Sequence, residues 1–278
     1  MTPCRTAWIL ALALVTPPVA RGDETPASVR LEAMRGLARA VAVAEAKPNT
    51  PAGLIPEPIY RFDDPARAFG DGSIWAYGKL GRPAAIFCLS VAKNDDGSSR
   101  WIHELTSLAD GPVLGTSQHP SGAWTWKPKG PETRFQAIPR APTPADTDTK
   151  RLQQMREIAR RFKAFESLDP ARNDPADRFE LRLLPQPIHR YHDPEHGQVD
   201  GAIFLLSYGR NPEVALLIEA QRAGKGDPAW SYALARIGAA RMRVSLDDRE
   251  VADLPKPVDA GWTSPYFLFD RPASGLKD

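Results

Sequence analysis

Apolar positions along the chain follow two patterns, one typical of helices and one typical of strands. In two segments apolar residues recur every three or four positions, which lines one face of a helix. These residues are Leu31, Met34, Leu37, Ala38 and Val41 in the first segment and Leu152, Met155, Ile158, Ala159 and Phe162 in the second. The pattern therefore predicts one amphipathic helix at the start of each half of the chain.

Segments typical of strands follow each predicted helix and are separated by turn residues. They cover 58–62, 73–77, 84–92, 101–108 and 133–138 in the first half, and 181–191, 202–208, 214–221, 230–237, 242–246 and 266–269 in the second. Asp71-Gly72 and Asp200-Gly201 precede strands. They predict tight turns, because glycine tolerates positive φ and aspartate bonds its own backbone.

The two halves also match residue by residue. Residues 54–65 and 183–194 are identical at 7 of 12 positions, and the same spacing of 129 continues to Trp101 and Trp230. Residues 30–39 match 151–160 at a spacing of 121. Two ordered matches of this length predict a tandem duplication.

These elements predict an α+β fold in which each copy is one amphipathic helix packed on an antiparallel sheet of roughly four to six strands. The predicted boundaries are 23–142 for the first copy, 143–150 for a linker and 151–274 for the second copy. One face of each sheet is expected to pack on its helix and the other on the sister copy. The sequence leaves open whether the copies form one domain or two.

Residues 1–22 have the features of a secretory signal peptide. Arg5 precedes an apolar run from Ala7 to Val15, and Ala20-Arg21-Gly22 has small residues where a signal peptidase cleaves. The run is shorter than the roughly 20 residues that span a bilayer, and no later stretch is apolar enough. We therefore expect an exported protein, periplasmic or extracellular, with no transmembrane segment in the mature chain.

Charge and cysteine content narrow the classes of partner. The chain has 36 basic and 34 acidic residues, and the signal holds two of the basic ones, Arg5 and Arg21, so the mature chain is neutral. This balance gives no reason to expect nucleic acid as a partner. Cys88 is the single mature cysteine and lies in an apolar run, which predicts a buried thiol without a disulfide within the chain.

The segment His189–His196 is the densest polar feature and holds three of the five histidines. Imidazole and carboxylate groups suit a transition metal. However, His189 and His192 are three apart, so they face opposite sides of a strand, and the first copy has Tyr60 and Asp63 in their places. We therefore predict a polar loop, no metal and no cofactor.

Arg61 and Arg190 occupy equivalent positions between aromatic or imidazole neighbours. A guanidinium group forks onto carboxylate or phosphate, so the pair could form two related anion sites. In the alternative, which we favour, each arginine pairs with a nearby aspartate, or with loop or helix carbonyls, and fixes the first strand on the sheet.

Trp124 and Trp126 have no counterpart in the second copy. Two residues apart on a strand, they share a face and form either an aromatic platform for a ligand or a plug between the copies.

Hydrolase and nucleotide-binding motifs are absent from the sequence. Ser117, His119 and Ser121 lie together, and His103 precedes an acid, but adjacency in sequence is not triad geometry.

The motifs L-x-P-x-P-I-x-R-[FY]-x-D-P, D-G-x-I and W-x-Y-A-L-A-R resemble those of an uncharacterised family of exported proteins of planctomycete-type bacteria. The resemblance implies no activity, ligand or site. By topology alone, a helix on a curved antiparallel sheet is similar to the cystatin-like and NTF2-like cones, and fold does not imply function.

We therefore expect a non-enzymatic exported binding or scaffold protein for a small molecule, a glycan or another protein, with its site between or within the copies. The alternative is a hydrolase or metal-assisted enzyme that uses His189–His196 with Arg61 or Arg190 as anion anchor. The enzyme requires His189, His192 and Arg61 to converge on one pocket.

Overall fold

The computed structural model describes residues 26–45, 50–64, 69–119, 122–131, 133–167, 177–224 and 226–273. The predicted signal peptide, residues 1–22, lies outside them. Helices α1 (Pro26–Arg39) and α2 (Asp148–Ala159) form where the apolar spacing predicts helices, and each buries part of that stripe. The Thr147 hydroxyl accepts the Lys150 N–H and so caps the start of α2. Within the described part, neither helix is long and apolar enough to cross a membrane.

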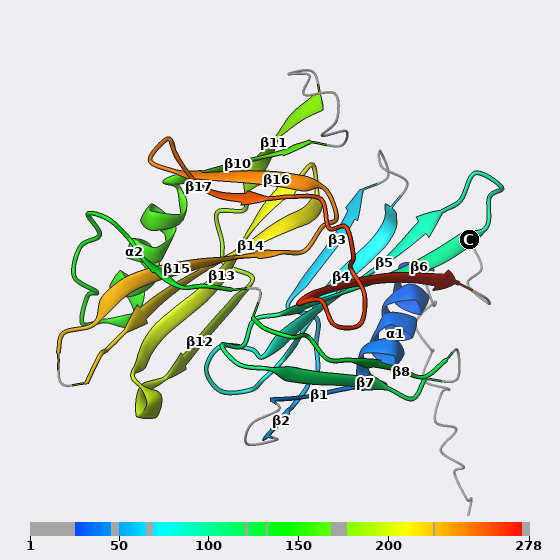
Figure 1. The fold of residues 1–278 in the computed structure, drawn as a ribbon, viewed down its shortest axis with the longest axis horizontal. Coiled ribbons are helices and arrows are strands. Elements are labelled where there is room, and N and C mark those ends of the chain that lie inside the picture. Colours follow the sequence, from blue (N-terminus) through cyan, green and yellow to red (C-terminus); the bar gives the residue numbers. More distant parts are fainter. Residues whose placement is uncertain are drawn as a thin grey trace, which may run out of the picture.

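The strands form three antiparallel sheets (Figure 1). The five-stranded sheet, in the order β18-β6-β5-β4-β3, contains β3 (Tyr60–Asp64), β4 (Phe69–Tyr77), β5 (Ala85–Lys93), β6 (Ser99–Ser107) and β18 (Tyr266–Pro272). The four-stranded sheet, β2-β1-β7-β8, contains β1 (Val41–Glu45), β2 (Thr50–Ala52), β7 (Val113–Ser117) and β8 (Trp124–Trp126).

The third sheet has nine strands, in the order β17-β16-β10-β11-β13-β14-β15-β9, with β12 also paired to β13. Its strands are β9 (Gln136–Ala137), β10 (Phe162–Ser167), β11 (Arg178–Leu183), β12 (His189–Asp193), β13 (Gln198–Tyr208), β14 (Asn211–Gln221), β15 (Ala229–Arg236), β16 (Arg241–Leu246) and β17 (Arg249–Leu254). A short 3-10 helix, η3 (Pro194–His196), connects β12 to β13.

The predicted α+β fold class is wrong, because the structure is mostly β. Strands account for 51% of it and helices for 13%, and the antiparallel sheets are large and curled. The apolar spacing predicts helices that are longer than those observed, because α1 ends at Arg39 and Val41 begins β1. In the same way α2 ends at Ala159, and Phe162 begins β10. Val41 and Phe162, which the spacing places at the ends of helices, therefore each begin a strand that enlarges the sheets.

The two Asp-Gly pairs lie inside β4 and β13, so the tight turns predicted there do not form. The strand register places Phe62 opposite Gly72 and Tyr191 opposite Gly201. A Cβ atom at Gly72 would lie 2.3 Å from the Phe62 ring, and one at Gly201 2.4 Å from the Tyr191 ring. Glycine is required at both positions because an aromatic ring covers the backbone, and neither residue has positive φ.

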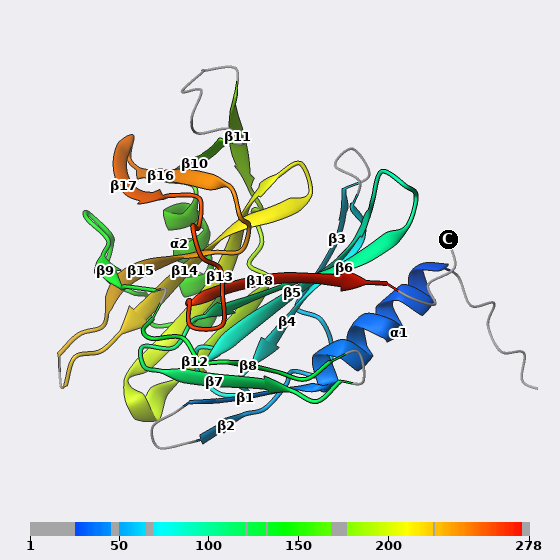
Figure 2. The same ribbon diagram turned by 45° about the vertical axis from the view of Figure 1, so that its right-hand side comes forward.

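Buried apolar side chains form three clusters. One packs between α1 and the five- and four-stranded sheets, and a second packs between α2 and the nine-stranded sheet. The third joins the outer face of the five-stranded sheet to the nine-stranded sheet, with Ile74, Ile86 and Leu108 from the first half of the chain and Ile203, Leu217 and Ile237 from the second. Figures 1 and 2 show α1 and α2 on opposite sides of the molecule, with sheets between them.

Each half of the chain contributes an edge strand that pairs with a strand of the other half. β9, from the first half, pairs with β15, whereas β18, at the end of the second half, pairs with β6 along its whole length. Trp101 in β6 and Trp230 in β15 match in the repeat, so the two halves exchange edge strands reciprocally. This exchange ties each half to the sheet of the other.

A buried ion pair also connects the halves. Arg82 Nε donates to Glu219 Oε1 at 2.9 Å, and their side chains are only 11% and 1% exposed. The Tyr191 hydroxyl donates to the same oxygen at 2.9 Å. The contact between the sheets therefore includes buried polar groups within a mainly apolar layer.

Candidate functional site

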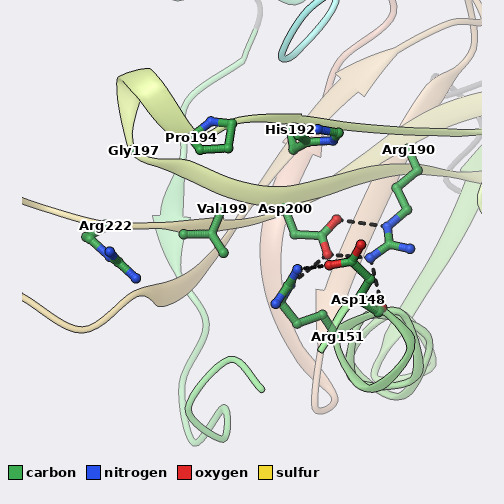
Figure 3. A pocket seen from close by; sticks show the side chains of 9 residues that line it. All are labelled: Asp148, Arg151, Arg190, His192, Pro194, Gly197, Val199, Asp200 and Arg222. Carbon is green, nitrogen blue, oxygen red and sulfur yellow. Dashed lines mark hydrogen bonds and ion pairs between the residues drawn. The ribbon is translucent and has the colours of Figure 1, made fainter. Parts of the chain in front are cut away.

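A polar cavity opens at the start of α2, beside β12 and β13 (Figure 3). Its volume is about 620 Å³, and it is lined by Asp148, Arg151, Arg190, His192, Pro194, Gly197, Val199, Asp200 and Arg222. This volume is within the range of pockets that hold small molecules. Its three guanidinium groups outnumber its two carboxylates, so these groups together leave one net positive charge.

Asp200 is the centre of an ion-pair network in the cavity wall. It is 2% exposed and accepts Arg190 Nε at 2.9 Å, Arg190 Nη2, and Arg151 Nε at 2.8 Å. Arg151 also donates to two backbone carbonyls before α2 and to the Asp148 carboxylate. Strand β12, strand β13 and the first turn of α2 thus meet on one carboxylate, which holds both arginines in place.

Two guanidinium groups at the cavity retain donors for a ligand. The Arg222 side chain is exposed and makes no hydrogen bond within the described residues, while its backbone N–H donates to Gly197 O at 2.9 Å. Arg190 uses Nε and Nη2 for Asp200 and the Asp148 carbonyl, and its Nη1 has no partner in the same part of the chain. Figure 3 shows the two guanidinium groups at opposite ends of the cavity, with Val199 and Asp200 between them, so each can donate hydrogen bonds to a different anionic group of a ligand.

Strand β12 divides the predicted site residues between two faces. Arg190 and His192 line the cavity. His189 is not part of its lining, and its ring lies 5.9 Å from the Tyr191 ring. Burial lowers the pKa of His189, which disfavours a charged imidazole at this place.

The remaining histidine of the segment is exposed. His196 Nδ1 lies 2.8 Å from Asp193 Oδ2, and this hydrogen bond raises the pKa of His196. Among the residues that the structure describes, no group of three or more His, Cys, Asp or Glu side chains could hold a metal ion.

Arg61 lies in the first half, far along the chain from the cavity residues, and its Nη2 is 2.9 Å from both carboxylate oxygens of Asp71. Arg61 and His189 therefore do not join His192 in the cavity, and the enzyme hypothesis lacks the convergence that it requires. Arg61 and Arg190 both make the aspartate pair of the favoured alternative.

Trp124 and Trp126 are buried, at 8% and 0% exposure. The Trp124 ring centre lies 6.1 Å from that of Trp262 and 6.0 Å from that of Phe267. Trp126 Nε1 donates to Ser264 O at 2.7 Å. Both indoles belong to the buried cluster under α1 and contact the last part of the chain.

His103, Ser117 and His119 line a small hollow inside the first half, whereas Ser121 is outside the described residues. The hollow has a volume of about 10 Å³, which is room for about one water molecule. A substrate has no space there, so these residues do not form a second candidate for catalysis.

Sequence reasoning missed Arg151, Arg222 and Asp148. In the repeat, Arg151 matches Arg30, and Arg222 aligns with Lys93. A search for positions that are basic in both copies could therefore have found Arg151 and Arg222. Asp148 has no such signal, because Ala27 occupies its place in the first copy.

Comparison of this chain with protein-family models, with curated proteins and with solved structures finds no match.

Proposed function

We propose that the chain is an exported, non-enzymatic binding protein whose second half holds an anionic small molecule in the cavity at the start of α2. The observation that carries this proposal is the pair of arginines with unused donors, Arg190 and Arg222, on one cavity. Guanidinium forks match the oxygens of carboxylate, phosphate and sulfate groups, so the ligand carries such a group.

The surroundings of Arg190 support binding. Its guanidinium group is already fixed by Asp200, so little side-chain freedom is lost when a ligand binds. Val199 and Pro194 add apolar surface beside the charged groups, which suits the organic part of a small acid or ester.

The test is calorimetric titration of the full chain with phosphate, sulfate and glucuronate, with glucose as the neutral comparison. Arg222→Ala should weaken oxyanion binding by about 10- to 150-fold, because a hydrogen bond to a charged group is worth roughly 1.5–3 kcal/mol. The folded structure should be unaffected, since the Arg222 side chain makes no hydrogen bond within the described residues.

Arg249→Ala is the matched control, because Arg249 is an exposed arginine in β17, away from the cavity lining. It should bind oxyanions like the unmodified protein. Equal affinity of Arg222→Ala and the unmodified protein would contradict the proposal, as would the absence of any binding at millimolar oxyanion.

The hydrolase alternative requires His189, His192 and Arg61 to converge on one pocket, and they do not. The cavity lining contains His192, but neither His189 nor Arg61. General acid–base chemistry needs a group within hydrogen-bond reach of the reacting atoms, and His189 faces the other side of its strand.

We also propose that the two halves arose by duplication of a unit that once paired with itself. Gly81 N–H donates to His192 O at 3.1 Å, and Arg210 donates to Asp63 at 2.5 Å. Residues 210 and 192 follow 81 and 63 by the repeat spacing of 129, so each contact is the counterpart of the other. Such reciprocal contacts are typical of a two-fold interface, and the exchange of β9 and β18 supports the same origin.

A further inference from the structure

We infer that the first half carries a second oxyanion site, formed by Arg30 and Arg61 around Asp71. The residues come from α1, β3 and β4, and none of them lines the cavity of the second half. The ligand class is a phosphate or sulfate group, whose oxygens accept several hydrogen bonds at once.

The two arginines are held together by one carboxylate. Arg61 Nη2 lies 2.9 Å from Asp71 Oδ1 and Oδ2, and Arg30 Nε lies 3.4 Å from Oδ2. Asp71 is 5% exposed, so it is shielded from solvent while it fixes the two guanidinium groups next to each other. This arrangement is built before any ligand arrives, which favours binding.

Most donors of the pair are unused. Nε and Nη1 of Arg61, and both Nη atoms of Arg30, have no hydrogen-bond partner among the described residues. The side chains of Arg61 and Arg30 are 38% and 22% exposed, so a solute can reach them. In the second half, by contrast, the corresponding Arg151 donates hydrogen bonds to Asp200, Asp148 and two backbone carbonyls.

The charges also favour an anion. Two guanidinium groups and one carboxylate leave a net positive charge at this place. The second half has Asp148 beside its arginines, but the first half has Ala27 at the equivalent position. The position that corresponds to Asp148 therefore carries no carboxylate beside Arg30.

The chain is bivalent if both sites bind. Helices α1 and α2 lie on opposite sides of the molecule (Figures 1 and 2), and each contributes one arginine to its own site. The two sites therefore cannot share a single small ion, and each should be counted separately in a titration.

The experiment is calorimetric titration of the full chain with inorganic phosphate, at low ionic strength to limit screening. The unmodified protein should bind two equivalents. Arg61→Ala should weaken one site by at least about tenfold and leave the site that Arg222→Ala weakens unchanged. Should Arg61→Ala fail to fold, as judged by circular dichroism, Arg30→Ala gives the same readout, because Arg30 holds Asp71 only at 3.4 Å.

The outcomes separate this inference from the proposed function. One equivalent that is lost in Arg222→Ala would overturn the second site and leave the cavity site standing. One equivalent that is lost in Arg61→Ala would support the second site and overturn the cavity site. No binding to the unmodified protein would overturn both.

Discussion

His103 lies inside the first half, where its ring stacks on Phe269 at 4.4 Å and near Phe87 at 5.8 Å between ring centres. It is 4% exposed, and its Nδ1 has no hydrogen-bond partner among the described residues. Burial, and then the neighbouring charge of Arg271, lower the pKa of His103 to about 3. The imidazole is therefore neutral in the folded protein at every pH near neutrality.

This depressed pKa makes His103 a source of acid sensitivity. Below the ordinary pKa of histidine, about 6.5, the unfolded chain takes up a proton at His103 that the folded protein refuses. Stability from this residue is complete above that pH and is lost as the pH falls toward the folded pKa. Between pH 7 and pH 4 the loss should be about 3 kcal/mol.

The comparison variant is His103→Phe, which keeps a ring between the same neighbours and removes the titration. In urea unfolding at both pH values it should lose about 3 kcal/mol less than the unmodified protein. His196→Ala is the control, because His196 is exposed and Asp193 raises its pKa. It should lose at least as much stability as the unmodified protein. Equal losses for His103→Phe and the unmodified protein would show that His103 does not titrate in this way.

At the scale of elements, the pairing of β12 with β13 depends on a glycine that an aromatic ring covers. Tyr191 faces Gly201, and its hydroxyl is bound to Glu219 at 2.9 Å, so the ring has little freedom to move away. A methyl group at Gly201 would meet the ring at 2.4 Å. The strand must then shift, and with it Arg190, the next residue to Tyr191 and a part of the cavity.

Gly201→Ala should lower the free energy of unfolding by about 1–3 kcal/mol, the usual effect of overpacking. Gly130→Ala is the matched control, since a Cβ atom there has nothing within 4 Å. Denaturant unfolding of the two variants measures the difference. A loss in Gly201→Ala no larger than in Gly130→Ala would mean that the ring does not hold this position.

The positions of the helices and of many strands were predictable because they follow the local spacing of apolar residues. The role of Gly201 was not, since the ring that covers it comes from another strand and the Asp-Gly pair equally suits a turn. The exchange of β9 and β18 was also beyond the sequence pattern, because pairing between distant strands leaves no local signal. In the candidate site, Arg190 was found from the repeat, but Arg222, which directly follows β14, lies on the same cavity only in the folded chain.

For the whole molecule, the contact between the sheets contains a buried charge pair, Arg82 with Glu219. Removing the cation leaves a carboxylate buried without its counter-ion, which costs about 3–5 kcal/mol. Exposed pairs are worth about 0–1 kcal/mol. Arg210 with Asp63 is such a pair and also crosses between the halves, with side chains 68% and 49% exposed.

Arg82→Met should therefore lower the free energy of unfolding by about 3–5 kcal/mol, and Arg210→Ala by no more than about 1 kcal/mol. Urea denaturation followed by tryptophan fluorescence measures both. Because the edge strands are exchanged, each variant should still unfold in a single transition. Similar small losses in the two variants would contradict the role of the buried pair.

We propose that the cavity at the start of α2 binds an oxyanion through Arg190 and Arg222. The most direct measurement is anomalous diffraction from crystals of the full chain soaked in selenate, a heavier analogue of sulfate. We expect a selenium peak in the cavity within hydrogen-bond distance of the Arg222 guanidinium, and we expect this peak to be lost in Arg222→Ala. A cavity without a selenium peak at millimolar selenate, or an unchanged peak in the variant, would contradict oxyanion binding in this cavity.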